Sequence, residues 1–334
     1  MLKVGLIGFG GISKVHRAAY AKLEKLGVAK LVCACDIDPE AFNKSVTINL
    51  GENETVDESG LRKYTDLDEM LAKETLDNVD ICVPTFKHAE LTVKCLELGY
   101  NVMCEKPMSL TFADCEKMVE AARKSGKELM IGQCVRFNPS YAYLKEVISD
   151  GRYGKVISAF FQRISTPPTW GWNNWFMKPE LSGGCLTDLH IHDVDVTRYL
   201  FGEPKSASCR ASSTVSIYDS AHTTLNYGDF PVTLIGDWSL NNVPFSATYR
   251  VGFEKASIIL NAGKVTVYPK DGSEPFEPEI AYGDSYYNEI EFFCNVVAGN
   301  VKNEKNPPES AARSVKLIEA LRKSANSGGE IINL

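Results

Sequence analysis

Short apolar runs alternate with helix-like stretches along the first part of the chain. The apolar runs that predict strands lie at residues 3–8, 30–36, 79–83, 101–104 and 128–132. Apolar positions with helical spacing predict helices between them, at residues 12–26, 38–50, 66–74, 88–98 and 111–125. Continuous apolar strands that alternate with helices are typical of a parallel sheet covered on both faces. We therefore expect residues 1–130 to form a doubly wound α/β domain.

The pattern changes after Asn138 and Pro139. The chain now contains β-rich runs separated by turn residues, at residues 155–165, 206–217, 222–227, 232–240, 246–253, 256–260 and 264–268. Such a pattern is typical of an antiparallel sheet. Helices are predicted around them, at residues 139–149, 186–201, 285–299 and 307–326. Because few helices remain to cover both faces of this sheet, we expect residues 131–334 to form an α+β domain with a large, mainly antiparallel, open-faced sheet.

Composition and charge narrow the classes of function. The 334 residues are 44% hydrophobic and 24% charged, with a formal net charge of −7 and no long run of Lys or Arg. Binding to nucleic acid or to an anionic membrane surface needs a basic footprint, so neither partner is expected. No apolar stretch approaches the ~20 residues that span a bilayer, and no signal peptide is recognised. We expect a cytoplasmic protein.

The cysteines agree with that location. Several of the ten lie in apolar runs such as residues 31–35 and 81–83, where a free cysteine behaves as a small hydrophobic side chain. No Cys-x-x-Cys spacing marks a zinc or redox site. We expect all ten to be reduced thiols.

A glycine-rich turn joins the first predicted strand to the first helix. Residues 8–13 read Gly-Phe-Gly-Gly-Ile-Ser, a Gly-x-Gly-x-x-Ser pattern. Gly8 permits the tight turn, and Gly10 lets a pyrophosphate approach the backbone. The helix that begins near Ile12 offers free N–H groups to the phosphates. Ser13 stands where this pattern usually has Gly or Ala, and a plain βα turn is the alternative interpretation.

The second predicted strand ends at an acid, Asp36, 26 residues after Gly10. An acid at this place accepts hydrogen bonds from the hydroxyls of the adenine ribose. It would repel the extra phosphate of NADP, and neither Ile37 nor Asp38 supplies a compensating cation. We therefore expect NAD to be preferred over NADP. The alternative is that Asp36 merely caps a helix that begins near Pro39.

Four further segments, together with the glycine turn, carry a resemblance to a known family. Three of them are Asn-Val-Met-Cys-Glu-Lys-Pro at 101–107, Asp-Ile-Cys-Val-Pro-Thr at 80–85 with a histidine at 88, and Gly-Gln-Cys-Val-Arg-Phe-Asn-Pro at 132–139. The fourth segment, residues 183–195, begins with Gly-Gly and contains an Asp-x-x-x-His pattern at residues 188–192. The chain resembles the Gfo/Idh/MocA family of NAD(P)-dependent oxidoreductases, in register from residue 3 to about 205. The resemblance implies a Rossmann fold for the first domain.

The resemblance also implies which residues bind the cofactor. They are Gly8, Gly10, Gly11, Ile12, Asp36, Ile37, Pro84, Thr85, His88, Glu105 and Lys106. It implies that Lys106 and His192 lie beside the nicotinamide, with Asp188 nearby. In the family the peptide bond between Lys106 and Pro107 is often cis.

These residue types suit the oxidation of a secondary alcohol, which needs a base for the O–H proton. His192 is the candidate base, and Lys106 would donate a hydrogen bond to the same oxygen. On one continuous helix, Asp188 and His192 are four residues apart and share a face, so the carboxylate would orient the imidazole. The alternative is a structural His–Asp pair and an ordinary surface lysine.

His190 and His192 form a His-x-His sequence that resembles the spacing of metal ligands. On a strand both side chains would face one side, but on the predicted helix they point about 200° apart. We therefore expect no catalytic metal. His190 stands where the family usually has glycine, and it either narrows the pocket or simply packs.

The substrate is expected to be a sugar, an inositol or a related polyol, as is common in the family. Arg136 resembles a family position that reaches substrate hydroxyls. Residues 166–176 contain three of the four tryptophans, Trp175 among them, next to Asn173 and Asn174. Aromatic faces pack against the C–H faces of sugars, although such tryptophans also serve as core or interface anchors.

Two other functions remain open. Some relatives use NAD for a transient oxidation that cleaves a glycosidic bond, and others are non-catalytic dinucleotide-binding regulators. The combination of Lys106, Asp188 and His192 favours an enzyme but does not separate a dehydrogenase from a glycosidase. Apolar residues in the open sheet, such as those of residues 232–235, predict a homodimer or homotetramer.

Overall fold

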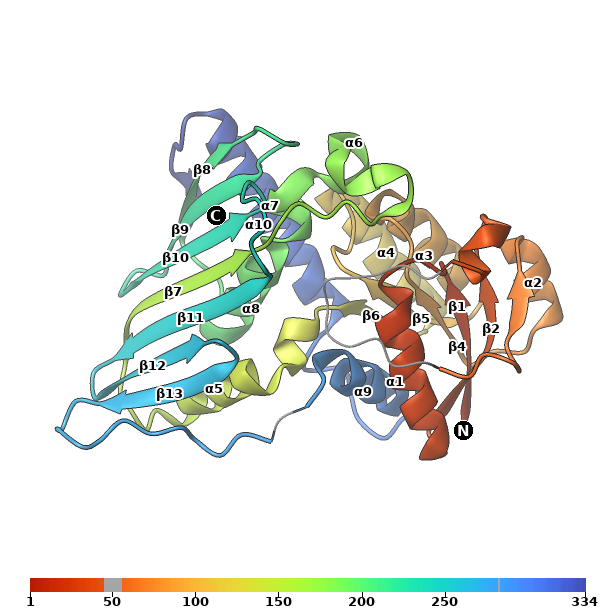
Figure 1. Ribbon diagram of the computed structural model, residues 1–334, viewed down its shortest axis with the longest axis horizontal. Helices are drawn as coiled ribbons and strands as arrows, with labels where there is room; N and C mark the ends of the chain where they lie inside the picture. Colours follow the sequence, from red (N-terminus) through yellow and green to blue (C-terminus); the bar gives the residue numbers. More distant parts are fainter. Residues whose placement is uncertain (45–55, 282) are drawn as a thin grey trace. The chain divides into compact units, whose positions relative to one another are not determined.

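The computed structural model describes residues 1–44, 56–281 and 283–334 of the chain. Contacts divide the chain into two compact units, both drawn in Figure 1. The first unit contains residues 1–134, 170–175 and 284–312, and the second contains residues 135–169, 176–283 and 313–334. Residues 284–312 therefore pack with the first unit, although they follow the second sheet in sequence.

Six parallel strands form the sheet of the first unit, in the order β3-β2-β1-β4-β5-β6. They are β1 (Leu2–Ile7), β2 (Ala29–Cys35), β3 (Arg62–Tyr64), β4 (Asn78–Ile81), β5 (Asn101–Glu105) and β6 (Leu129–Gly132). This arrangement confirms the predicted doubly wound sheet. The strand order reverses between β1 and β4, and open α/β sheets bind ligands at the carboxyl ends of the strands at such a point.

Helices cover both faces of this sheet. They are α1 (Ser13–Lys25), α2 (Leu67–Lys73), α3 (His88–Glu97), α4 (Phe112–Ser125) and α9 (Ser285–Val297), with short 3-10 turns η1 (Pro39–Phe42), η2 (Thr85–Lys87) and η3 (Cys134–Phe137). In Figure 1, α1 and α9 pack together in front of the sheet, whereas α3 and α4 pack together behind it. Sequence sets the helix ends: the Thr111 side chain accepts the N–H of Asp114 before α4, and Gly126 ends that helix in the left-handed conformation.

Eight strands form the sheet of the second unit, in the order β13-β12-β11-β7-β10-β9-β8-β14. They are β7 (Val156–Ile164), β8 (Ser206–Ser212), β9 (Ser220–Asn226), β10 (Pro231–Asp237), β11 (Ser246–Phe253), β12 (Ala256–Asn261), β13 (Lys264–Pro269) and β14 (Ile332–Asn333). β7 and β10 run parallel and the other neighbours run antiparallel, as predicted for a mainly antiparallel sheet. Burial alternates along β9, β10 and β11, so one face of the sheet is covered.

Most of the remaining helices belong to the second unit. They are α5 (Pro139–Asp150), α6 (Pro179–Ser182), α7 (Gly184–Asp188), α8 (Ile191–Phe201) and α10 (Pro308–Asn326), together with the 3-10 turn η4 (Trp172–Met177). All ten cysteines are buried and free, in agreement with the prediction of reduced thiols. Within the described ranges, no helix combines the length and the apolar character that crossing a bilayer needs.

Several predictions of local structure are wrong. The helix expected at 38–50 is only η1 where the chain is described, and residues 45–50 lie outside the described residues. The helix expected at 186–201 is interrupted between α7 and α8. The strand expected at 206–217 ends at Ser212. β3 and β14 were not predicted, because two or three residues carry no periodic signal.

Candidate functional site

The glycine turn between β1 and α1 has a backbone that side chains would obstruct. Gly8 has a φ of +94°, and a Cβ there would lie 2.5 Å from the carbonyl oxygen of Cys82. The N–H of Gly8 donates to the carbonyl of Cys35 at 2.8 Å, which ties the turn to the end of β2. A Cβ on Gly10 would meet no atom of residues 1–44, 56–281 or 283–334 within 4 Å, so packing among these residues does not explain glycine at this exposed position. Close approach of a ligand to the backbone would explain it.

α1 begins without a capping side chain. Ile12 stands at the N-cap and makes no side-chain capping hydrogen bond, and the first turn contains no acid. Gly11 is buried in the turn. Ser13 is also buried, and its hydroxyl donates to the carbonyl of Gly10 at 2.6 Å, so the turn accommodates this departure from Gly or Ala. The positive end of α1 is thus left to an external anion.

Asp36 joins the end of β2 to the glycine turn. One carboxylate oxygen accepts the N–H of Phe9 at 2.7 Å, and the other accepts the N–H of Asp38 at 2.9 Å. The cap of η1 is Asp38 instead, whose side chain accepts the N–H of Glu40. Asp36 is therefore not the residue that caps η1. Ile37, beside it, is 79% exposed.

A cation that the sequence analysis missed lies against the glycine turn. The guanidinium carbon of Arg17 lies 4.0 Å from the ring centroid of Phe9, the residue whose N–H binds Asp36. Arg17 also forms an ion pair with Glu58. Burial lowers the pKa of Arg17 to about 10. Arg17 lies in the second turn of α1, and its Nε donates to the carbonyl of Ser13, so local helical structure places it near this turn.

The segment after β4 presents an unsatisfied polar group. The hydroxyl oxygen of Thr85 is buried and has no hydrogen-bond partner among the described residues. His88 is buried, and its ring nitrogens lie 2.8 Å from the carbonyl oxygens of Pro107 and Val83. Burial lowers the pKa of His88, although both carbonyls favour its protonated form. His88 thus links this segment to the one that follows β5, with half-buried Pro84 between Val83 and Thr85.

Lys106 follows the carboxyl end of β5 and is half-buried. Its peptide bond to Pro107 is cis, as the resemblance implied. Its backbone N–H donates to Oε2 of the buried Glu105 at 3.0 Å. The backbone around the candidate lysine is therefore held by the side chain of the preceding residue.

A buried ionisable cluster adjoins Glu105, and the sequence analysis did not single it out. Nδ1 of His16 lies 2.8 Å from Asp80, and Nε2 lies 2.9 Å from Glu105. Burial by itself would lower the pKa of His16, but the charge of Asp80 raises it well above its ordinary value. The sequence did contain one indication of this cluster: His16 is spaced along α1 so that it shares the buried face of the helix with Tyr20 and Leu23.

The helix that carries the predicted catalytic pair is broken between the two residues. α7 ends at Asp188, and α8 begins at Ile191. The N–H of His190 donates to a carbonyl five residues back, at Cys185, whereas the N–H of His192 donates to one only three residues back. The regular four-residue repeat is lost here, so the argument from one continuous helical face fails. Asp188 and His192 are both buried.

His190 packs against the sheet of its own unit. Its Nε2 lies 2.9 Å from the hydroxyl of Thr223, and a Cβ on Gly236 would lie 2.6 Å from its Nδ1. Burial lowers the pKa of His190 to about 3, so the side chain is neutral. Among the described residues, the groups close enough to share a metal ion include His16 and neither His190 nor His192.

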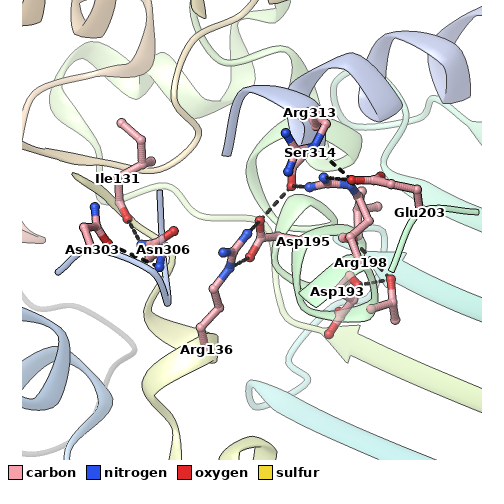
Figure 2. Close-up of polar contacts among 12 residues, drawn as sticks. Ile131, Arg136, Asp193, Asp195, Arg198, Glu203, Asn303, Asn306, Arg313 and Ser314 are labelled. Carbon is pink, nitrogen blue, oxygen red and sulfur yellow. Dashed lines mark hydrogen bonds and ion pairs between the residues drawn. The ribbon is translucent and has the colours of Figure 1, made fainter. Parts of the chain in front are cut away.

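Arg136 is buried in an ionic network that Figure 2 shows. Its guanidinium is 1% exposed and forms two hydrogen bonds with Asp195 on α8, at 2.7 and 2.6 Å. Asp195 also accepts the hydroxyl of Ser314 on α10 at 2.7 Å. The network continues through Arg198 to Glu203. Arg136 thus anchors the helix that carries His192, and its expected contact with substrate stays a prediction.

The tryptophan-rich segment belongs to both units. Residues 170–175 group with the first unit, whereas the residues on either side of them group with the second. Asn173 and Asn174 adopt left-handed backbone conformations, which asparagine tolerates better than most residues. Trp175 is buried, whereas Trp172 is 49% exposed.

Two family models match most of the chain. The model of the oxidoreductase family with an NAD-binding Rossmann fold matches residues 2–133. The model of the GFO/IDH/MocA C-terminal domain matches residues 141–259.

Individual relatives agree with these matches. Myo-inositol 2-dehydrogenase of Thermotoga maritima is 30% identical over 204 residues, which cover 60% of this chain and 55% of that protein. The chain thus matches only about half of that relative's length. D-glucoside 3-dehydrogenase of Escherichia coli is 26% identical over 99% of this chain and 97% of that protein.

A solved structure shares the whole fold. The WlbA dehydrogenase of Bordetella pertussis, in complex with NADH and UDP-GlcNAcA, superposes with a TM-score of 0.82 at 22% identity, and the match covers 100% of this chain and 98% of that one. Fold and both family models agree with the residues that carried the resemblance. The chain belongs to the Gfo/Idh/MocA family of oxidoreductases.

Proposed function

We propose that this protein transfers a hydride between NAD(H) and a secondary alcohol or ketone of a sugar, inositol or related polyol. The observation that carries the proposal is the glycine turn. The described residues would leave room for a side chain at position 10, yet the residue there is glycine. The helix that follows begins without a capping side chain. Family membership supplies the reaction class, and the names of the relatives supply the substrate class.

The residues of the first unit fit a dinucleotide. Gly8, Gly10, Gly11 and Ile12 would hold the pyrophosphate, and Asp36 with Ile37 would adjoin the adenine ribose. The buried hydroxyl of Thr85 lacks a hydrogen-bond partner within the part of the chain that the structure describes, and it would gain one from the cofactor. Pro84, His88, Glu105 and Lys106 complete the proposed cofactor set. When bound, NAD⁺ supplies the acceptor for the hydride that leaves the alcohol carbon.

Three side chains are proposed to handle the proton. In the oxidising direction, the imidazole of His192 takes the hydroxyl proton of the substrate, and the ammonium of Lys106 donates a hydrogen bond to the same oxygen. Asp188 stabilises the imidazolium that forms. In the reducing direction, His192 returns the proton.

NAD is the proposed cofactor in preference to NADP. The Asp36 carboxylate would repel an additional phosphate on the ribose. Arg17 lies at the same turn, but its charge is paired with Glu58, so it offers the phosphate less compensation than an unpaired cation would.

Substrate recognition is proposed to use the tryptophan segment. The half-exposed Trp172 offers an aromatic face, and the neighbouring asparagines offer amides. Trp175 is buried and would act by supporting this segment. Because Arg136 is already bonded to Asp195, the geometry favours a supporting role for it over direct contact with a hydroxyl.

A panel of sugars, inositols and other polyols, with NAD added, tests the proposal through absorbance at 340 nm. A dehydrogenase produces NADH in proportion to the ketone formed. Release of a free sugar without net NADH would identify an NAD-dependent glycosidase instead. Tight NADH binding without any turnover would identify a dinucleotide-binding regulator.

A further inference from the structure

Four buried ionisable side chains meet in the first unit next to the proposed catalytic lysine. We infer that His16 is a positioning residue, a buried cationic bridge that holds the side chain of Glu105 and, through it, the backbone of Lys106. The bridge itself follows from contacts, whereas its effect on turnover rests on the proposed function.

With Asp80 and Glu105 ionised, the contacts of His16 require hydrogens on both ring nitrogens. Burial alone would raise the pKa of Glu105, but the imidazole of His16 in turn lowers it. Nδ1 lies 2.8 Å from a carboxylate oxygen of Asp80 on β4, and Nε2 lies 2.9 Å from one of Glu105 on β5. A carboxylate only accepts hydrogen bonds, and a neutral imidazole has a single N–H. Only the imidazolium donates to both carboxylates. The ring is fully buried, so its charge is compensated by these two groups and not by water.

Glu105 transmits this contact to Lys106. One of its oxygens faces His16, and the other accepts the backbone N–H of Lys106 at 3.0 Å. Gly132 on β6 leaves room for this side chain, because a Cβ there would lie only 3.2 Å from Oε1. His16 lies on the helix that begins at the glycine turn. The bridge therefore connects the proposed phosphate-binding helix to the proposed catalytic segment.

Glu289 on α9 completes the cluster as a neutral acid. It is 0% exposed, and neither of its carboxyl oxygens has a hydrogen-bond partner among the described residues. One of them lies within 4.8 Å of the His16 and Glu105 ligand atoms. Burial and the charge of Glu105 raise the pKa of Glu289 well above its ordinary value of 4.5. The cluster then holds two carboxylates, one imidazolium and one carboxylic acid.

Other titratable groups face this cluster. Cys82 donates to Asp80 at 3.7 Å, and the ring of Tyr286 lies 6.1 Å from that of His16. Burial raises the pKa of Cys82 to about 12, so this thiol is neutral. Lys106 and Asp284 contribute charge at longer range.

The first measurement needs neither a variant nor a substrate. In wild-type protein labelled with ¹⁵N-histidine, both ring nitrogens of His16 should show imidazolium chemical shifts at pH 7, above the ordinary histidine pKa of about 6.5. A neutral His16 tautomer at pH 7 would overturn the bridge. One equivalent of a tightly bound metal in the purified protein would also overturn it, because a ligating nitrogen carries no hydrogen.

The second measurement compares His16→Gln with Leu23→Ala. Leu23 is fully buried two turns along the same helix and lies outside the cluster, so it controls for lost stability. In His16→Gln, kcat should fall about 10²-fold, the loss expected when a reacting group moves by ~1 Å, with the polyol KM and the NADH affinity nearly unchanged. Leu23→Ala should keep kcat. Equal losses of kcat in the two folded variants would make His16 merely structural.

Hydrogen exchange separates this inference from the proposed function. The amide of Lys106 should lose protection in His16→Gln and keep it in Leu23→Ala, whether or not a polyol is turned over. If wild-type protein turns over no polyol, the proposed function fails, and amide exchange together with the NMR titration still decides the inference.

A separate experiment tests whether Glu289 is a neutral acid. It can be done even if His16→Gln does not fold. Glu289 has a raised pKa in the folded state, so its contribution to stability is complete below about pH 4.5 and is lost as the pH rises. The unfolding free energy of the wild type should therefore fall relative to that of Glu289→Gln from pH 5 to pH 8. Parallel pH profiles would show that Glu289 is ionised in the fold and would overturn this part of the cluster.

Discussion

At the scale of single residues, Asp36 serves the turn and the proposed cofactor at once. Its two oxygens already hold the N–H groups of Phe9 and Asp38. Each carboxylate oxygen has more than one lone pair, so these bonds leave acceptor capacity for ribose hydroxyls. Substitution of Asp36 should therefore affect both the affinity for dinucleotides and the discrimination between them.

We predict that Asp36→Ala narrows the preference for NAD over NADP. The additional change Ile37→Arg should move the preference toward NADP, because the exposed position 37 would then offer a cation to the extra phosphate. The ratio of dissociation constants for NADH and NADPH, measured by fluorescence titration, checks both variants. Arg17→Gln is the matched control, and it should change the ratio less than Asp36→Ala. Tighter binding of NADPH than NADH by the wild type would refute the assignment of Asp36.

We predict that Lys106→Ala and His192→Ala each lower kcat by about two to four orders of magnitude, the range for lost electrostatic or acid–base groups. NAD affinity should change much less, because both groups are proposed to act on the substrate oxygen. Steady-state kinetics and NADH titration measure the two effects separately. Asp188→Asn should lower kcat less than His192→Ala does, because it weakens only the orientation and charge stabilisation of the imidazole.

The two losses should not multiply in the double variant, because groups that serve one proton transfer act as a unit. A His192→Ala enzyme with nearly normal kcat at neutral pH would remove His192 as the base. Lys106, or a tyrosine of the second unit, would then be the next candidate.

At the scale of elements, the break between α7 and α8 is associated with a close contact on the sheet. His190 lies at this break, and Gly236 on β10 leaves it room. A Cβ on Gly236 would lie 2.9 Å from the Cβ of His190, a distance that real side chains do not tolerate. The glycine is therefore required by the side chain that packs against it.

We predict that Gly236→Ala lowers the free energy of unfolding by about 1–3 kcal/mol, the usual cost of overpacking. Combining it with His190→Ala should recover part of that loss, because the smaller side chain makes room for the new methyl group. Urea denaturation of the wild type, both single variants and the double variant measures this coupling. Simple addition of the two single effects would show that the contact between these positions is unimportant.

At the scale of the whole molecule, the sheet of the second unit has one buried and one less buried face. Val232 and Leu234 are fully buried, whereas Ile235 belongs to the opposite, half-buried face. Phe160 and Ile259 lie on that face too, together with Arg250, whose guanidinium lies 4.5 Å from the Phe160 ring centroid. The half-buried face of the sheet thus carries charged as well as apolar side chains, whereas the run of residues 232–235 had drawn attention only to apolar ones.

We predict that this face joins copies of the chain into a dimer or tetramer. A half-buried sheet face with aromatic and aliphatic side chains is a common contact surface. Sedimentation at micromolar concentration should give a mass above the 36.9 kDa of one chain, and Phe160→Asp should shift it toward the monomer. Thr266→Asp, near the edge of the same face, is a control expected to have a smaller effect. A wild-type monomer would contradict the prediction.

Local sequence patterns were enough to predict the order and the kind of the long helices and strands. Continuous apolar runs such as residues 79–83 predicted buried parallel strands, and β-rich runs between turn residues, such as residues 222–227, predicted strands of an antiparallel sheet. The glycine turn and the acid of Asp36 could be recognised too, because each directly follows a predicted strand. Local periodicity and turn chemistry encode such features, so they needed no tertiary information.

The contacts between side chains that are distant in sequence became visible in the folded chain. The tertiary structure interrupted the expected helix at His190, bonded Arg136 to Asp195, and paired Arg17 with Glu58. It also assembled His16 with carboxyl groups from three other elements, among them that of Glu289, which is remote in sequence. The physical reason is that burial and charge compensation depend on packing between elements, and no spacing along one element records which partner lies opposite.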